Sequence, residues 1–118
     1  MKRPDDDALL VDILIAAREA RELSRGVSLD DFLEDRMLQL AVEKLVEIMG
    51  EAASRMTPDG RSQLPALPWR DIVGMRHRLV HDYRHVSLMK VWQVLDDDLE
   101  PLIAAIEAAV SPDDAEPN

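Results

Sequence analysis

The sequence predicts an all-α fold, an up-and-down antiparallel helical bundle with four main helices plus a short one. Aromatic residues make up only 3% of the chain although 47% of its residues are hydrophobic, so aliphatic side chains must form the core. Apolar residues recur at steps of three and four, and no stretch has the pattern of a strand. We expect one domain over residues 1–110 and a disordered polar tail over residues 111–118.

Two helix start signals lie near the N-terminus. Pro4 is followed by three aspartates, which are favourable at the positive end of a helix dipole. This helix is expected to end near Arg25 and Gly26, because glycine suits the position just after a helix. Ser28 and Asp31 then form a variant of the capping box ahead of a short helix with the sequence LDDFLED.

A long helix is predicted from about Asp35 to Met56. Its apolar residues step by four and three, as in a heptad seam: Leu38, Val42, Leu45, Met49, Ala52 and Met56. Met37, Ala41 and Ile48 form a second stripe on the same helix. We therefore expect this helix to be central and to contact more than one neighbour.

The second half of the chain is predicted to hold a loop and two further helices. Residues 57–68 contain three prolines and a glycine and are expected to form the loop. The next helix is expected to begin at Trp69 and to end within residues 81–84. Ser87 can cap the fourth helix, in which Pro101 is expected to produce a kink.

Composition narrows the possible functions. The chain has no cysteine, which excludes disulfides and thiolate catalysis. It has no signal-peptide pattern and no apolar run long enough to span a membrane, so we expect a soluble, cytoplasmic protein. The net charge of −10 disfavours a broad nucleic-acid surface, but residues 69–90 carry +3 and the remainder −13. This basic segment suits contact with a few phosphates, or equally a helix paired with acidic neighbours.

The stretch MRHRLVHDYRH, residues 75–85, contains all three histidines and the only tyrosine. Histidine exchanges protons near neutral pH, and arginine binds phosphate oxygens through a permanently charged fork. The combination suits phosphodiester cleavage, in which His81 would move a proton and Arg76 would stabilise the pentavalent phosphorus. The two residues point about 140° apart on an ideal helix, so they share one cleft only if its last turn loosens.

The presence of only one His81 in each chain favours a dimer. RNA can be cleaved by its own 2′-hydroxyl without a metal ion, and the reaction gains from one base and one acid. A single His81 supplies only one of these roles. A two-fold dimer with two copies of the site face to face would supply both, so we expect a homodimer.

Other interpretations of these residues are open. His77 and His81 have a helical spacing that can hold zinc, but the nearby arginines oppose a dication, so we expect no metal site. Tyr83 could be a buried ring with a satisfied hydroxyl group. Glu51 could orient Arg76 or His81, or could form an ordinary salt bridge between helices.

The motif Arg76, four residues, His81, one residue, Tyr83 resembles the signature of HEPN-domain ribonucleases, specifically the HepT-like toxins. His77 occupies the place after the arginine where such toxins usually have a polar residue, so it is a candidate supporting residue. The flanking stretches EIMGEAA, LPWRDIVGMRHRLVHDY and VWQVLDDDLEPLI are also similar to the family. The likeness covers about residues 9–110.

The resemblance implies a dimerising helical bundle with a metal-independent RNase site at the dimer cleft, in which Arg76 and His81 are catalytic and no cofactor is needed. RNA is the expected substrate, and DNA is not expected. The resemblance also implies a partner, a nucleotidyltransferase antitoxin of the MntA type, which silences such toxins by transferring AMP onto the motif tyrosine, here Tyr83. The added phosphate would bring negative charge into a cleft built for RNA phosphate. The alternative is a non-catalytic helical adaptor that serves a nucleotidyltransferase.

Overall fold

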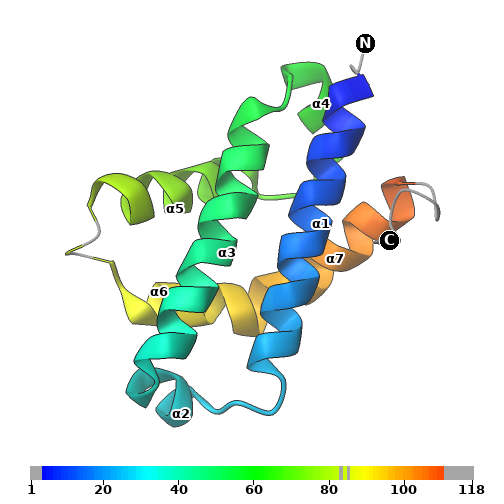
Figure 1. Cartoon of the computed structure of the whole chain (residues 1–118). Coiled ribbons are helices and arrows are strands. Elements are labelled where there is room, and N and C mark those ends of the chain that lie inside the picture. The colour runs from blue at the N-terminus through cyan, green and yellow to red at the C-terminus, as the bar shows by residue number, and fades with distance from the viewer. Residues whose placement is uncertain (1–3, 83, 85, 111–118) are drawn as a thin grey trace.

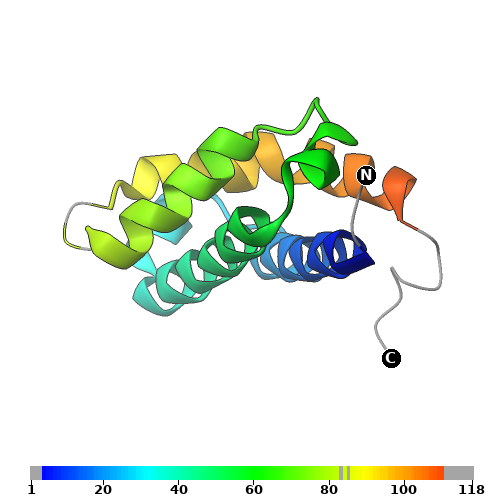
Figure 2. The same ribbon diagram turned by 90° about the horizontal axis from the view of Figure 1, so that it is seen from above.

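The computed structural model describes residues 4–82, 84 and 86–110, and every regular element among them is helical. The elements are α1 (Pro4–Ser24), α2 (Leu29–Glu34), α3 (Arg36–Arg55), α4 (Pro58–Ser62), α5 (Trp69–His81), α6 (Leu88–Gln93), η2 (Val94–Asp98) and α7 (Leu99–Ala109). α1 and α3 lie side by side in opposite directions and form one layer (Figure 1). α5 and the C-terminal arm, which consists of α6, η2 and α7, form a second layer on one face of the first (Figure 2). The all-α prediction is confirmed.

Local capping sets the ends of the first helices, and the roles of Gly26 and Ser28 are those that the sequence predicts. Gly26 has a positive φ of 73°, which ends α1 in the left-handed region that glycine tolerates. The Ser28 side chain accepts a hydrogen bond from the Asp31 amide at 3.1 Å and begins α2. The Asp35 carboxylate accepts from the Leu38 amide at 3.0 Å and begins α3.

α3 is central, because it packs against α1, α2, α5 and α6. Its heptad seam is buried in the core from Val42 to Met56, whereas Leu38 is only partly buried. The second stripe behaves differently: Met37 is 82% exposed and Ile48 is 38% exposed. Part of the apolar surface that the sequence places on α3 is therefore not covered by any described element.

The prediction that residues 57–68 form only a loop is wrong in part. Thr57 caps α4 by accepting a hydrogen bond from the Gly60 amide at 3.0 Å, and Pro58 occupies the first turn of this helix. Threonine followed by proline is a helix start signal. The loop was predicted instead because the segment contains three prolines. The Thr57 amide and hydroxyl both donate to the buried carboxylate of Asp6, so α4 is tied to the start of α1.

The predicted fourth helix is the C-terminal arm, and its irregular turn precedes the proline. Ser87 caps the arm as predicted, by accepting from the Lys90 amide at 3.3 Å. The π-helical turn η2 follows, in which the Leu99 amide donates to the Val94 carbonyl five residues back. A proline ring clashes with the carbonyl four residues earlier, which for Pro101 belongs to Asp97 inside η2. The wider turn accommodates this clash, and the predicted kink at Pro101 stays a prediction.

No helix of the described ranges combines the length and the hydropathy needed to cross a membrane. The predicted tail, residues 111–118, lies outside the described residues. The homodimer stays a prediction.

Candidate functional site

α5 is positioned by a close approach to α3 at Gly50. A Cβ atom added at Gly50 would overlap the Cβ atom of Arg76 and would lie 2.9 Å from the carbonyl oxygen of Ile72. Only glycine allows two helix backbones to approach this closely. The contact therefore fixes the point at which the Arg76 side chain leaves α5. A glycine inside a strongly heptad-like helix was the available sequence signal for this contact, and it was missed.

Glu51, which follows Gly50 on α3, forms a salt bridge with Arg76. Its Oε2 atom lies 2.9 Å from Nη2 of Arg76, and the two side chains are 47% and 30% exposed. The Nε atom of Arg76 is buried and has no hydrogen-bond partner among the described residues. Of the predicted roles for Glu51, the structure shows the salt bridge between helices, and this salt bridge also orients the guanidinium of Arg76.

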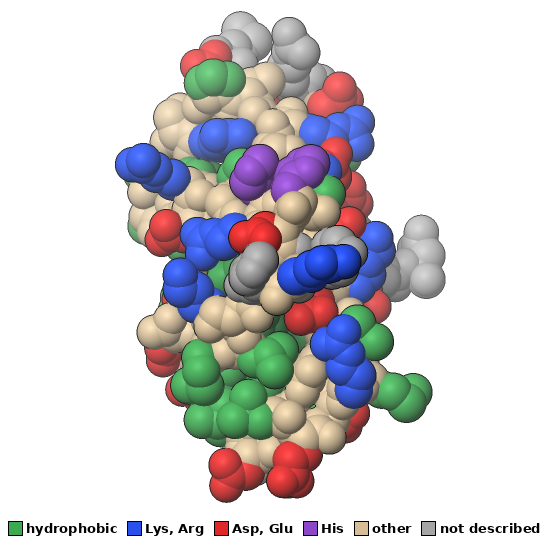
Figure 3. All heavy atoms as spheres, turned by 90° about the vertical axis from the view of Figure 1, so that its left-hand side faces the viewer, with side chains coloured by type: hydrophobic (Ala, Val, Ile, Leu, Met, Phe, Trp, Pro, Cys, Tyr) green, Lys and Arg blue, Asp and Glu red, His purple; other side chains and the backbone are tan. Residues whose placement is uncertain are grey.

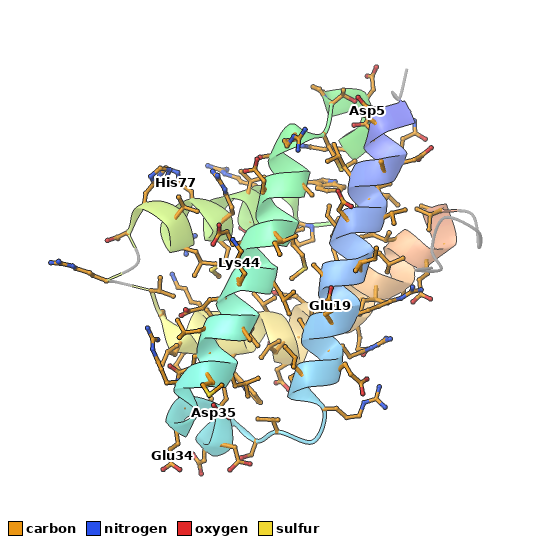
Figure 4. The ribbon with its side chains drawn as sticks, in the orientation of Figure 1. Asp5, Glu19, Glu34, Asp35, Lys44 and His77 are labelled. Atoms are coloured by element: carbon orange, nitrogen blue, oxygen red, sulfur yellow. The ribbon has the colours of Figure 1, made fainter. Side chains whose placement is uncertain are left out.

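His77 and His81 lie next to each other at the C-terminal end of α5. Their ring centroids are 4.7 Å apart, the ring planes are tilted by 47°, and both side chains are exposed. Figure 3 shows the two rings on one face, with Lys and Arg side chains on both sides. His77 points away from the bundle in Figure 4. This end of α5 is thus a basic, solvent-accessible surface.

α5 remains a regular α-helix as far as His81. The amide of Asp82 still donates to the carbonyl of Arg78 at 2.9 Å. The helix ends within the predicted range, but its last turn does not loosen. Arg76 and His81 consequently project about 140° apart along α5.

Two further predictions concern the modification of Tyr83 and metal binding. Tyr83 and His85 lie outside the described residues, so the predicted modification of Tyr83 stays a prediction. In the described part of the chain, no three His, Asp or Glu side chains are grouped so as to hold a metal ion.

The other side of α5 borders a groove that the sequence did not reveal. It encloses about 430 Å³ between α5 and the C-terminal arm, and it is mainly apolar. Its charged lining residues are Asp71 and Arg78 on α5 and Lys90 and Asp98 on the arm. Burial raises the pKa of Asp98, and the nearby carboxylates of Asp97 and Asp71 raise it further.

These features define a class of protein. It is a two-layer helical bundle in which one helix, α5, carries a salt-bridged arginine and two exposed histidines. Residues 13–109 match the family model described as "Ribonuclease HepT-like", a range that includes the whole Arg76 to Tyr83 motif. The chain belongs to this HepT-like, HEPN-type ribonuclease family.

The names of similar proteins are consistent with this family. The chain is 35% identical over 107 residues to "Probable ribonuclease HepT" of Thermococcus cleftensis, which covers 91% of this chain and 96% of that protein. It is 30% identical over 107 residues to "Putative RNase MJ1380" of Methanocaldococcus jannaschii, covering 91% and 98% of the two chains. No solved structure matches the chain at a significant level.

Proposed function

We propose that the protein is a metal-independent endoribonuclease and the toxin of a toxin–antitoxin pair. The observation that carries this proposal is the guanidinium of Arg76, which Glu51 holds where α5 crosses α3, five residues before the exposed His81 on the same helix. Membership of a ribonuclease family and the names of the relatives support it.

The proposed reaction uses the RNA's own 2′-hydroxyl as the nucleophile. One His81 imidazole accepts the proton of the 2′-hydroxyl as its oxygen bonds to phosphorus. A second, protonated imidazole donates a proton to the 5′-oxygen as the bond between phosphorus and that oxygen breaks. Arg76 stabilises the negative charge on the pentavalent phosphorus. The products are a 2′,3′-cyclic phosphate and a free 5′-hydroxyl.

The second imidazole is proposed to come from a second copy of the chain. The rings of His77 and His81 lie against each other, with centroids 4.7 Å apart, rather than facing each other across a gap. His77 is better placed beside His81 as a supporting group. His81 is exposed in the single chain, so it would be accessible to a symmetry mate in a homodimer.

Regulation is proposed to act on Tyr83 through an MntA-type nucleotidyltransferase. The phenol oxygen would bond to the α-phosphorus of ATP and release pyrophosphate, leaving AMP on the tyrosine. Tyr83 is two residues from His81 in the sequence, so the added phosphate would place negative charge and bulk at the site.

The test is cleavage of RNA by wild type, Arg76→Ala and His81→Ala, each made without the antitoxin and assayed in EDTA. Loss of either group should slow cleavage by about 10²- to 10⁴-fold, whereas EDTA should have no effect. Arg70→Ala is a matched control, because Arg70 is an exposed arginine of α5 outside the motif. Circular dichroism should show the same helix content in all variants.

Intact mass completes the experiment. Co-expression with the nucleotidyltransferase should add the mass of one or more AMP groups, and Tyr83→Phe should prevent this. A protein with unmodified Tyr83 that binds the nucleotidyltransferase stably but cuts no RNA would instead support the adaptor. The net charge of −10 is the observation that favours that alternative.

A further inference from the structure

A pocket with both charged and apolar lining lies between α3 and the end of α5, and we call it the α3 pocket. It encloses about 510 Å³, which is within the usual range of small-ligand sites, and the start of α6 closes its third side. Its charged lining combines cations and carboxylates: Arg36, Lys44 and Arg84 with Glu43 and Glu47. Its apolar lining consists of Leu40, Leu79, Val86 and Leu88. The pocket therefore offers hydrogen-bond donors and acceptors beside an aliphatic wall.

The α3 pocket adjoins the salt bridge that holds Arg76. Glu47 of the pocket precedes Glu51 by about one turn of α3, a rise of about 6 Å, and Glu51 binds Arg76. On α5, Leu79 lines the pocket three residues after Arg76, about 60° away around the helix. Acidic and basic side chains also lie close together on the face that carries the two histidine rings (Figure 3). A phosphate bound by Arg76 would therefore leave the adjoining nucleotide of the strand within reach of the pocket.

Glu43 is the carboxylate of the pocket that is open to a ligand. The Oε1 atom of Glu47 already lies 3.3 Å from Nζ of Lys44, whereas Glu43 has no hydrogen bond or salt bridge among the described residues. Partial desolvation raises the pKa of Glu43, and the nearby charge of Arg36 offsets part of this rise. A partly dehydrated carboxylate without a donor gains most from a ligand that supplies two N–H groups at once.

We propose that the α3 pocket binds the guanine base of the nucleotide next to the phosphate at Arg76, with the Glu43 carboxylate accepting hydrogen bonds from N1–H and N2–H of the base. The inference rests on the proposed function, because it names the base beside the cleaved bond. Guanine presents two adjacent donors and the O6 acceptor on one edge, which match a carboxylate beside the guanidinium of Arg36. Adenine, cytosine and uracil each present a single donor group on that edge, so one carboxylate oxygen would stay unpaired.

The rest of the α3 pocket suits the remainder of a nucleotide. The side chains of Leu40, Val86 and Leu88 offer an apolar surface for the flat face of the base. The lining has three cations against two carboxylates, so its positive charge exceeds its negative charge by one. Lys44 and Arg84 can therefore accept the phosphate attached to the bound nucleoside.

The first test measures the binding of GMP, AMP, CMP and UMP by isothermal titration calorimetry, with protein whose Tyr83 is unmodified. GMP should bind about 10-fold or more tightly than the other three, because one bidentate pair gives about this discrimination. IMP lacks the N2 amino group and should bind between GMP and AMP. Glu43→Gln should abolish the preference, because the amide replaces one acceptor oxygen by a donor. Glu19→Gln makes the same change at an exposed glutamate of α1 outside the pocket and should keep the preference.

The second test measures cleavage of RNA oligonucleotides that differ at one position, which holds guanine, inosine or adenine. Wild type should cut beside guanine about 10-fold or more faster than beside adenine, with inosine between them. This ratio should approach one for Glu43→Gln and should stay at the wild-type value for Glu19→Gln. Circular dichroism should show the same helix content in all three proteins.

The outcomes separate this inference from the proposed function. A preference for GMP that Glu43→Gln abolishes, in a protein that cleaves no RNA, would support the pocket while the ribonuclease proposal fails. Absent or equal binding of the four nucleotides would overturn the pocket, as would cleavage without regard to the base, and neither result touches the ribonuclease proposal. A preference for guanine that survives Glu43→Gln, or a preference for another base, would also overturn the inference.

Discussion

The two sides of α5 differ in how closely they are packed. Toward α3 the helix backbones approach so closely at Gly50 that no β-carbon fits, and Arg76 emerges at this contact. Toward the C-terminal arm α5 makes few contacts and leaves a groove of about 430 Å³ lined by both acidic and basic side chains. The α3 side therefore determines where the proposed catalytic arginine lies, whereas the arm side can change with little effect on it.

The largest effect on stability and activity is expected from Gly50→Ala, which disrupts the close packing of α5 against α3. The added methyl group would overlap Arg76 and press on the backbone of Ile72, so α5 would have to move away from α3. Overpacking of this kind costs about 1–3 kcal/mol of unfolding free energy, which urea denaturation would measure. RNA cleavage should fall together with stability, because the displaced helix carries Arg76. Unchanged stability and activity would show that the close approach is not required.

Gly74→Ala is the matched control on α5 itself. A Cβ atom there would meet only a guanidinium nitrogen of Arg78 at 3.6 Å, which is ordinary contact. Replacing glycine by alanine inside a helix stabilises it by about 0.5–1 kcal/mol, so this variant should be more stable and remain active. Destabilisation by both substitutions would mean that α5 tolerates no methyl group anywhere, and the contrast between its two sides would fail.

Glu51→Gln separates positioning from packing at the tight contact. The salt bridge with Arg76 is partly exposed, so its loss should cost only about 0–1 kcal/mol of stability. A misplaced guanidinium should lower kcat for RNA cleavage by about 10- to 100-fold, with little change in KM. Single-turnover kinetics would measure this split. A purely structural salt bridge would lower stability without changing kcat.

The features that the sequence predicted correctly are local in the chain. The caps at Ser28 and Ser87 each depend on a side chain and an amide three residues away, and the buried seam of α3 depends on periodicity along one helix. The family and the helical fold followed from the same local patterns together with the motif that ends at Tyr83.

The features that were missed depend on residues far apart in the chain. The contact of Gly50 with Arg76 requires the crossing of two helices, and neither residue signals its partner. The groove beside α5 exists because α5 packs on α3 and the arm packs mainly on α1, rather than on each other. The wide turn η2 was not predicted, because the sequence marks Pro101 but not where the backbone accommodates it.

The smallest effect is expected on the open side of α5, from Asp98→Asn. Partial desolvation, followed by the carboxylates of Asp97 and Asp71, raises the pKa of Asp98 above its ordinary value of 3.8, so the charged form is disfavoured in the folded protein. The folded state thus loses some stability wherever Asp98 is ionised. Removing the charge should stabilise the protein at neutral pH, by no more than about 0.5 kcal/mol because the side chain is exposed. This gain should shrink as the pH falls through the raised pKa and disappear below the ordinary value, where Asp98 is protonated in both states. Denaturation curves at several pH values would measure it, and a gain independent of pH would show that packing, and not charge, limits this side of the helix.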